Sequence, residues 1–323
     1  MDQTGELMRI LTVLTYYRPH TSGLTIYVER LARTLVKRSH EVTVLTSQFD
    51  ENLPREEVVD GVRIVRAPVL LRISKGVIMP TFGYLAWKLA LDHDVIHLHL
   101  PQFDAAGVAL RGRILRKPTV ITYHCDLELP PGLFNRFVNQ VVLFMNNLAG
   151  RFTHRIGAYT EDFARHSPYL KNFSENVRVI LPPVDLPPAS EDDVVEFRQT
   201  HNLDKRGPVI GMATRFASEK GVEILLDAFP SVLERYPDAM ILFAGQYVNV
   251  MGEEEYFERL KPIIEDYRSK GQWEFLGNLS PAQIAAFYPN LDVLVVPSLN
   301  STETFGPVSD THLTIQTTSM RGS

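Results

Sequence analysis

The stretch VIGMATRFASEKGVEILLDAF, residues 209–229, contains a strand, a loop and a helix in close succession. Residues 209–212 are apolar and are typical of a buried strand, and residues 222–229 have the spacing of an amphipathic helix. Arg215 follows the strand, and Lys220 stands beside the start of the helix. A helix N-terminus favours anions because it presents unpaired N–H groups and a partial positive charge. This stretch therefore predicts an α/β unit with an anion site at the end of its strand.

A second stretch, residues 297–306 (PSLNSTETFG), repeats this plan about eighty residues later. It follows another apolar strand and places Glu303 and Gly306 at the mouth of that strand. Carboxylate oxygens accept hydrogen bonds from sugar hydroxyls, whereas backbone N–H groups suit phosphate. Together the two stretches predict a site for a nucleoside diphosphate that carries a sugar. The alternatives are that Arg215 and Lys220 form surface ion pairs and that Glu303 stabilises the start of a helix.

Strand-like and helix-like segments alternate along the chain, as in parallel sheets covered by helices on both faces. The prolines of residues 181–188 interrupt the alternation and indicate a linker. We therefore expect two Rossmann-like α/β domains that face each other across a cleft, at residues 1–185 and 186–306. The expected strands cover residues 9–14, 41–46, 62–66, 95–99, 119–123, 156–159, 208–213, 239–244, 273–276 and 292–296. The expected helices cover residues 25–38, 133–149, 219–236, 253–270 and 281–288.

The composition of the chain indicates a globular protein and argues against a nucleic-acid-binding one. The chain has 323 residues, of which 45% are apolar and 22% are charged, as in globular domains. Its net charge of −5 argues against a nucleic-acid partner, which requires a strongly basic face. Cys125 is the only cysteine, the first residues do not resemble a secretory signal, and apolar runs are too short to span a bilayer. These features predict a cytoplasmic protein.

The first predicted domain offers two further candidates at strand ends. The loop before the first helix ends in Ser22-Gly23, where the glycine permits close approach of a ligand to the backbone. His124 follows the strand 119–123, and Asp126 could orient its ring or cap a turn. A purely structural role is the alternative for both. We expect His97 and His99 to face opposite sides of their strand, and no metal site is predicted.

The combination of these segments resembles the retaining glycosyltransferases of family 4, which have the GT-B fold. The resemblance covers about residues 8–306, and it is carried by Ser22-Gly23, His124, Arg215 with residues 219–221, and residues 297–306. It implies that residues 1–185 form the acceptor side and residues 186–306 bind the nucleotide sugar. It further implies that Arg215 and Lys220 bind the diphosphate, that Gly23 and the backbone of Phe305 and Gly306 lie near the donor, and that the catalytic residues are His124 and Glu303.

The resemblance also implies a chemistry. Sugar would pass from a nucleoside diphosphate to an acceptor hydroxyl with retention at the anomeric carbon and without a metal ion or other cofactor. The leaving phosphate would help to take the acceptor proton, which agrees with the lack of an identifiable protein nucleophile. The donor base would lie near Gln246 and residues 276–278, and these residue types do not indicate whether the base is uracil or guanine.

Two departures from the family pattern stand out. The first loop has Ser22-Gly23 where the family commonly has Gly-Gly, and Thr311 occupies the position of the second glutamate of a Glu-x7-Glu motif. Residues 307–323 are rich in serine and threonine and have no helical stripe. We therefore expect an incomplete second domain that ends in an atypical tail, by truncation or a change of reading frame.

Three functions are compatible with these observations: an active glycosyltransferase, a catalytically impaired remnant that still binds nucleotide sugars, and a GT-B-like epimerase of the sugar nucleotide. The partners would be a nucleotide-sugar donor and a sugar, lipid-linked or small-molecule acceptor, with no nucleic acid. The helix around residues 134–144 could contact a membrane peripherally, at its inner face, or could simply face the core.

Overall fold

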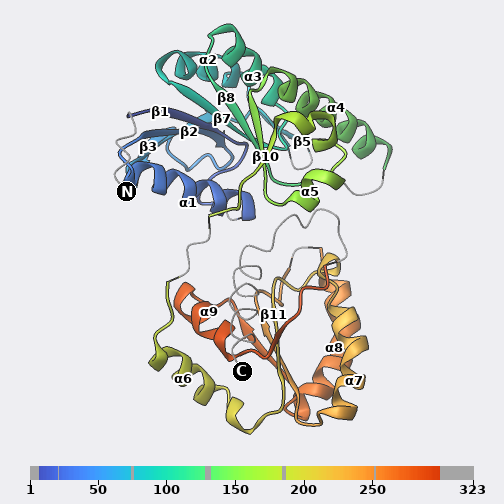
Figure 1. The fold of residues 1–323 in the computed structure, drawn as a ribbon. Coiled ribbons are helices and arrows are strands. Elements are labelled where there is room, and N and C mark those ends of the chain that lie inside the picture. The colour runs from blue at the N-terminus through green and yellow to red at the C-terminus, as the bar shows by residue number, and fades with distance from the viewer. Residues whose placement is uncertain are drawn as a thin grey trace. The chain divides into compact units, whose positions relative to one another are not determined.

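The computed structural model describes residues 7–20, 22–73, 76–127, 132–183, 187–250 and 252–298. The chain divides into two compact units, unit 1 (Met1–Pro183) and unit 2 (Val184–Ser323). Both are α/β units with parallel sheets, which confirms the expected pair of Rossmann-like domains (Figure 1). The predicted tail at residues 307–323 lies outside the described residues.

The main sheet of unit 1 has the order β10-β9-β8-β7-β1-β2-β4-β3 among the described residues, and β3 alone runs antiparallel there. Buried aliphatic positions in β1, β2 and β7 place the core along the middle of this sheet. Its strands are β1 (Arg9–Val13), β2 (Glu41–Gln48), β3 (Glu56–Val59), β4 (Val62–Pro68), β7 (Val95–Leu100), β8 (Thr119–Tyr123), β9 (Arg155–Ala158) and β10 (Val177–Val179); β5 (Leu71–Ile73) and β6 (Gly76–Ile78) form a separate hairpin.

Helices cover both faces of the sheet in unit 1. Figure 1 shows α2, α3 and α4 together on one face, with α1 and α5 on the other. The first helix begins at Gly23 because Ser22 caps it. The Ser22 hydroxyl accepts a hydrogen bond from the Thr25 amide, and the Thr25 hydroxyl accepts one from the Ser22 amide. The helices are α1 (Gly23–Lys37), α2 (Phe82–Asp92), α3 (Ala105–Ile114), α4 (Leu133–Phe152) and α5 (Glu161–His166), with a 3-10 turn η1 (Leu170–Asn176).

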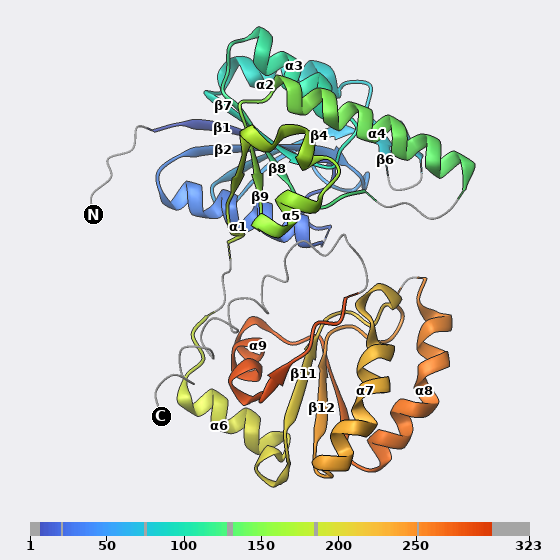
Figure 2. The same ribbon diagram turned by 45° about the vertical axis from the view of Figure 1, so that its right-hand side comes forward.

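The sheet of unit 2 is parallel throughout its described strands, in the order β13-β12-β11-β14. Figure 2 shows α7 and α8 on one face and α6 and α9 on the other. Its strands are β11 (Val209–Ala213), β12 (Met240–Ala244), β13 (Trp273–Gly277) and β14 (Val293–Leu294). Its helices are α6 (Glu191–Thr200), α7 (Val222–Arg235), α8 (Glu254–Ser269) and α9 (Pro281–Phe287), with 3-10 turns η2 (Leu203–Lys205), η3 (Ser218–Lys220) and η4 (Tyr288–Asn290).

Two predicted elements of unit 2 need correction. The helix expected over residues 219–236 is split into η3 and α7, because Gly221 between them has a φ of +68° in the left-handed region. The last strand, expected over residues 292–296, is limited to Val293 and Leu294.

Candidate active site

Three aromatic polar side chains meet where strands β7, β8 and β9 end in unit 1. These strands are parallel neighbours, so their carboxyl ends share one edge of the sheet. His99 lies near the end of β7, His124 directly after β8, and Tyr159 directly after β9. The Nδ1 atom of His99 lies 3.0 Å from Nε2 of His124, and the Tyr159 hydroxyl is hydrogen-bonded to Nδ1 of His124. Both nitrogens of His124 are therefore engaged within the protein.

Helix α1 closes this cluster from one side. The Tyr27 ring on α1 contacts the His124 ring edge-on, with 5.0 Å between ring centroids. About one turn of α1 thus separates Tyr27 from the Ser22-Gly23 loop that precedes the helix. A Cβ atom at Gly23 would meet nothing within 4 Å, so the space beside this residue is open.

The expected orientation of His97 and His99 is wrong. Residues two apart in a strand point to the same side, because side chains alternate with a period of two. The rings of His97 and His99 accordingly lie together, with centroids 4.2 Å apart. His97 is also bonded through Nε2 to the Thr122 hydroxyl at 2.8 Å.

Burial keeps the cluster uncharged. The side chains of His99 and His124 are 1% and 6% exposed. This burial lowers the pKa of His124 to about 3 and the pKa of His99 well below its ordinary value. Burial likewise raises the pKa of the Cys125 thiol to about 11, so the neighbouring cysteine is not a thiolate nucleophile.

Asp126 does not orient His124. Its Oδ1 atom accepts hydrogen bonds from the Tyr123 hydroxyl at 2.9 Å and from the Ser167 hydroxyl at 2.8 Å. Asp126 thereby connects the segment after β8 to the segment after α5, so its role is structural. The sequence analysis missed Tyr159, a hydrogen-bond partner of His124, although a polar residue at the end of the predicted strand 156–159 was a usable signal.

In unit 2, the loop between β11 and α7 carries the predicted cations. Arg215 forms an ion pair with Glu219, and its side chain is 58% exposed. Burial raises the pKa of Glu219, but the backbone hydrogen bond within Glu219 and the positive charges of Arg215 and Lys220 outweigh burial and lower it overall. Lys220 ends η3, and only Gly221 separates it from Val222, the first residue of α7.

Buried aromatic rings hold this loop in place. Phe216 is fully buried, and its ring lies 5.5 Å from those of Phe243 and Tyr256 between centroids. Its amide donates to the carbonyl of Gln246 at 2.7 Å. The amide of Ser218 donates to a carboxylate oxygen of Glu253 at 2.9 Å, so the loop already binds an anionic group. The fixed loop leaves Arg215 at the surface beside these N–H donors.

The described start of the second stretch, Pro297, lies beside the first stretch. Strands β11 and β14 are neighbours, with Ile210 paired to Val293. Pro297 passes so close to the start of α7 that a Cβ atom at Gly221 would collide with its carbonyl oxygen. The chain leading toward Glu303, Phe305 and Gly306 therefore starts beside Lys220, whereas those three residues lie outside the described residues.

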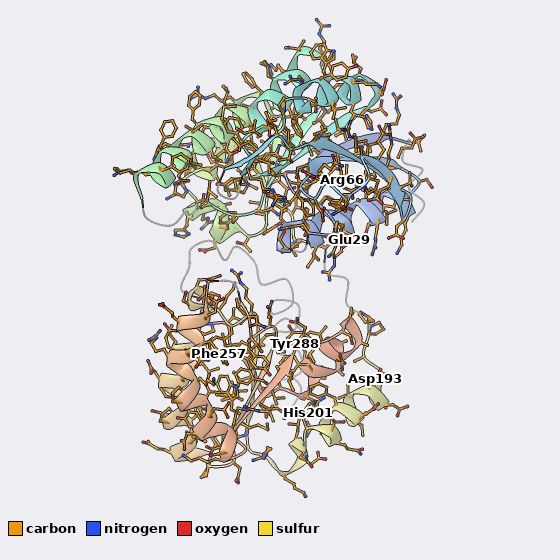
Figure 3. The ribbon with its side chains drawn as sticks, turned by 180° about the vertical axis from the view of Figure 1, so that it is seen from behind. Glu29, Arg66, Asp193, His201, Phe257 and Tyr288 are labelled. Carbon is orange, nitrogen blue, oxygen red and sulfur yellow. The ribbon has the colours of Figure 1, made fainter. Side chains whose placement is uncertain are left out.

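One hollow was not predicted. It encloses about 460 Å³ between α1, the loop after β1 and the β3–β4 edge of unit 1. Arg66 lies beside it, buried, and donates to Glu57 at 2.5 Å and to the Pro54 carbonyl at 2.9 Å; Figure 3 labels Arg66 and the lining residue Glu29. The lining residues are Tyr17, Arg18, Pro19, Glu29, Arg33, Leu53, Pro54, Glu57, Val59, Asp60, Val62 and Ile64.

Two features are absent from the described parts of the chain. Among those residues, no group of three or more His, Cys, Asp or Glu side chains could hold a metal ion. No helix built from them is long and apolar enough to cross a bilayer.

Comparison with known proteins gives consistent matches over both units. Residues 21–187 match the family model "Glycosyltransferase Family 4", and residues 193–309 match "Glycosyl transferases group 1". The 2-deoxystreptamine N-acetyl-D-glucosaminyltransferase of Streptomyces fradiae is 27% identical over 296 residues, which cover 85% of this chain and 69% of the relative. The GDP-mannose-dependent alpha-mannosyltransferase of Mycolicibacterium smegmatis is 26% identical over 308 residues, covering 91% and 75%.

Among solved structures, Anabaena Alr3699/HepE in complex with UDP superimposes with a TM-score of 0.66. The match has 20% sequence identity and covers 91% of this chain and 75% of that protein. At this identity the likeness concerns the fold.

Proposed function

Because this chain belongs to glycosyltransferase family 4 and has the two-domain GT-B fold, it transfers a sugar from a nucleotide sugar. We propose that this transfer proceeds with retention at the anomeric carbon and without a metal ion. In the proposed reaction, the bond from the anomeric carbon to the leaving phosphate oxygen breaks, and a bond to the acceptor oxygen forms on the same face. The acceptor proton passes to the leaving diphosphate. The acceptor is a sugar, a small molecule or a lipid-linked hydroxyl.

The observation that carries this proposal is the position of Arg215 and Lys220 in the loop that leads from β11 into α7, beside the Pro297 segment. A leaving diphosphate gains negative charge, and preorganised cations and N–H groups stabilise that charge without a metal. The Ser218 amide that binds the Glu253 carboxylate supports an anion at this loop. We propose that Arg215 and Lys220 hold the diphosphate, and that Glu303 and the backbone of Phe305 and Gly306 complete the donor site.

In unit 1, we propose that the His124 segment and the open space at Gly23 border the reaction centre. His124 is neutral, and its two nitrogens are held by His99 and Tyr159. These two neighbours act as positioning residues, because they fix the orientation and tautomer of the His124 ring.

The test is nucleotide binding by Lys220→Ala, measured by calorimetry with UDP and GDP. Loss of a charge-assisted hydrogen bond to phosphate costs about 1.5–3 kcal/mol, so affinity should fall roughly tenfold to a hundredfold. Lys205→Ala is the matched control, because Lys205 precedes β11 and Lys220 follows it, which puts them at opposite ends of the strand. Unchanged affinity in Lys220→Ala would refute the assignment.

Turnover is tested separately by incubating the chain with nucleotide sugars and acceptors, identifying the products by mass spectrometry and assigning their sugar configuration by NMR. A glycosylated acceptor with the donor's anomeric configuration supports the proposal. Nucleotide binding without turnover would indicate an impaired remnant, and free epimerised donor would indicate an epimerase.

A further inference from the structure

Three neighbouring helices of unit 1 carry apolar side chains on the face turned away from the sheet. A surface helix normally keeps polar residues on that face. On α2, the outward positions hold Tyr84, Trp87 and Leu91, which are 69%, 38% and 50% exposed. On α3, Leu110 and Ile114 are 42% and 58% exposed. These positions recur every three or four residues, so each set forms one stripe along its helix.

The apolar stripe continues on α4. Leu133, Phe137 and Phe144 lie on one side of this helix and are 89%, 66% and 65% exposed, and Phe134 beside them is 60% exposed. Figures 1 and 2 both show α2, α3 and α4 side by side on the same face of the sheet. We call this layer the α2–α4 face.

No comparable surface occurs on the other described helices. The α2–α4 face carries nine exposed large hydrophobic side chains, whereas helices α1, α5, α6, α7, α8 and α9 together carry three: Val195, Ile224 and Ile263. Scattered exposed hydrophobics are ordinary, but a concentration on adjacent helices marks an interaction surface.

The charge of the same helices is basic. They contain five basic residues and one acidic residue, although the whole chain has a net charge of −5. The acidic residue is Asp92, and the basic residues are Lys88, Arg111, Arg113, Arg136 and Arg151. The twenty residues of α4 contain two arginines and no carboxylate. The surface therefore combines apolar side chains with a positive field.

We propose that the α2–α4 face lies on the surface of an anionic lipid bilayer. Phenylalanine and leucine side chains enter the boundary between headgroups and acyl chains, tryptophan and tyrosine favour that boundary, and arginine and lysine contact anionic headgroups. A protein partner of the same size would also cover apolar area, but the excess of cations complements a lipid surface. The inference does not depend on the proposed sugar transfer.

The first test is co-sedimentation of the full chain with vesicles of phosphatidylcholine, with and without about one-third phosphatidylglycerol. We expect binding to the anionic vesicles and at least ~10-fold weaker binding by the double variant Phe137→Ser, Phe144→Ser, because each ring loses its buried area. Arg136→Glu with Arg151→Glu should weaken binding similarly, since each arginine contributes on the order of a fivefold change near an anionic surface. The control, Val195→Ser with Ile263→Ser, removes two exposed apolar side chains from unit 2 and should bind as the unchanged chain does.

The second test uses the chain's two tryptophans. Trp87 lies on the α2–α4 face, whereas Trp273 is 3% exposed in the core of unit 2. Lipids with brominated acyl chains should quench part of the fluorescence, and Trp87→Phe should abolish that quenching. Circular dichroism of each variant shows whether it remains folded.

Three results would overturn the proposal. The first is no association with anionic vesicles and no quenching of Trp87. The second is equal binding to vesicles with and without phosphatidylglycerol. The third is a dimer of the chain in sedimentation velocity that Phe137→Ser with Phe144→Ser dissociates, which would make a second copy the occupant of this face.

Discussion

At the scale of single residues, the Glu219 carboxylate would compete with a bound diphosphate for Arg215. Glu219 is ion-paired with Arg215, the cation that the diphosphate would use. We predict that Glu219→Gln tightens UDP binding two- to fivefold, because an opposing charge near a partly exposed cation is worth up to about 1 kcal/mol. Calorimetry measures this change. Glu234→Gln, near the end of α7, alters the net charge equally and should have no effect. Weaker binding by Glu219→Gln would mean that Glu219 orients Arg215.

Tyr159 allows a second test at this scale. Replacing it by phenylalanine removes the hydroxyl bonded to Nδ1 of His124 and frees that ring to change orientation or tautomer. We predict a fall in kcat of about tenfold with the KM for the donor changed less than about twofold, which is the size expected for a misplaced neighbour of the reaction centre.

The control for Tyr159 is Tyr169→Phe. Tyr169 is equally buried in unit 1, but its hydroxyl has no hydrogen-bond partner among the described residues. Steady-state kinetics of this variant should match the unchanged enzyme. Equal loss of kcat in both variants would assign the effect to general packing.

At the scale of elements, Gly221 determines where α7 begins. It has a φ of +68°, and a Cβ atom there would strike the Pro297 carbonyl. We predict that Gly221→Ala destabilises unit 2 by about 3 kcal/mol, from left-handed strain of about 1–2 kcal/mol and the collision with backbone. Urea unfolding followed by Trp273 fluorescence measures the change, in the Trp87→Phe background.

Gly252→Ala separates the two contributions. Gly252 has a φ of +82°, but nothing lies within 4 Å of its would-be Cβ. Its replacement should cost only the strain, about 1–2 kcal/mol. If both substitutions cost the same, close packing of Pro297 on α7 is unimportant for stability.

The alternation of apolar strands and amphipathic helices was sufficient to predict both α/β units, because burial on a parallel sheet imposes that pattern directly. The loop of Arg215 and Lys220 was likewise visible as a strand followed by a helix start. The split was missed because Gly221 was included in the predicted helix, whereas its φ of +68° is left-handed. The close approach of Pro297 to Gly221 joins residues far apart in the chain, which local sequence does not show. The pairing of His99 with His124 also depends on strand order, which local sequence does not contain.

At the scale of the whole molecule, the two units differ in their response to acid. The unfolded chain gains a proton on His124 below pH 6.5, but in the folded chain burial lowers that pKa to about 3. The unfolded chain thus binds more protons between these values, and the free energy of unfolding of unit 1 falls as pH decreases through this window. His97, whose pKa burial lowers to about 4, and His99 act in the same direction. Asp104 opposes them, because burial raises its pKa to about 6 in the folded chain.

We predict that unit 1 loses about 2 kcal/mol of stability between pH 7 and pH 5, and so unfolds before unit 2 in acid. In Trp87→Phe, urea unfolding at pH 5 should show an early phase in circular dichroism that Trp273 fluorescence in unit 2 does not follow. His99→Asn removes one buried titrating group and should reduce the difference between the two pH values, whatever its effect on absolute stability. His166→Asn, at an exposed site on α5, should leave that difference unchanged. A single transition seen equally by both probes at pH 5 would show that the buried histidines do not set the acid response of unit 1.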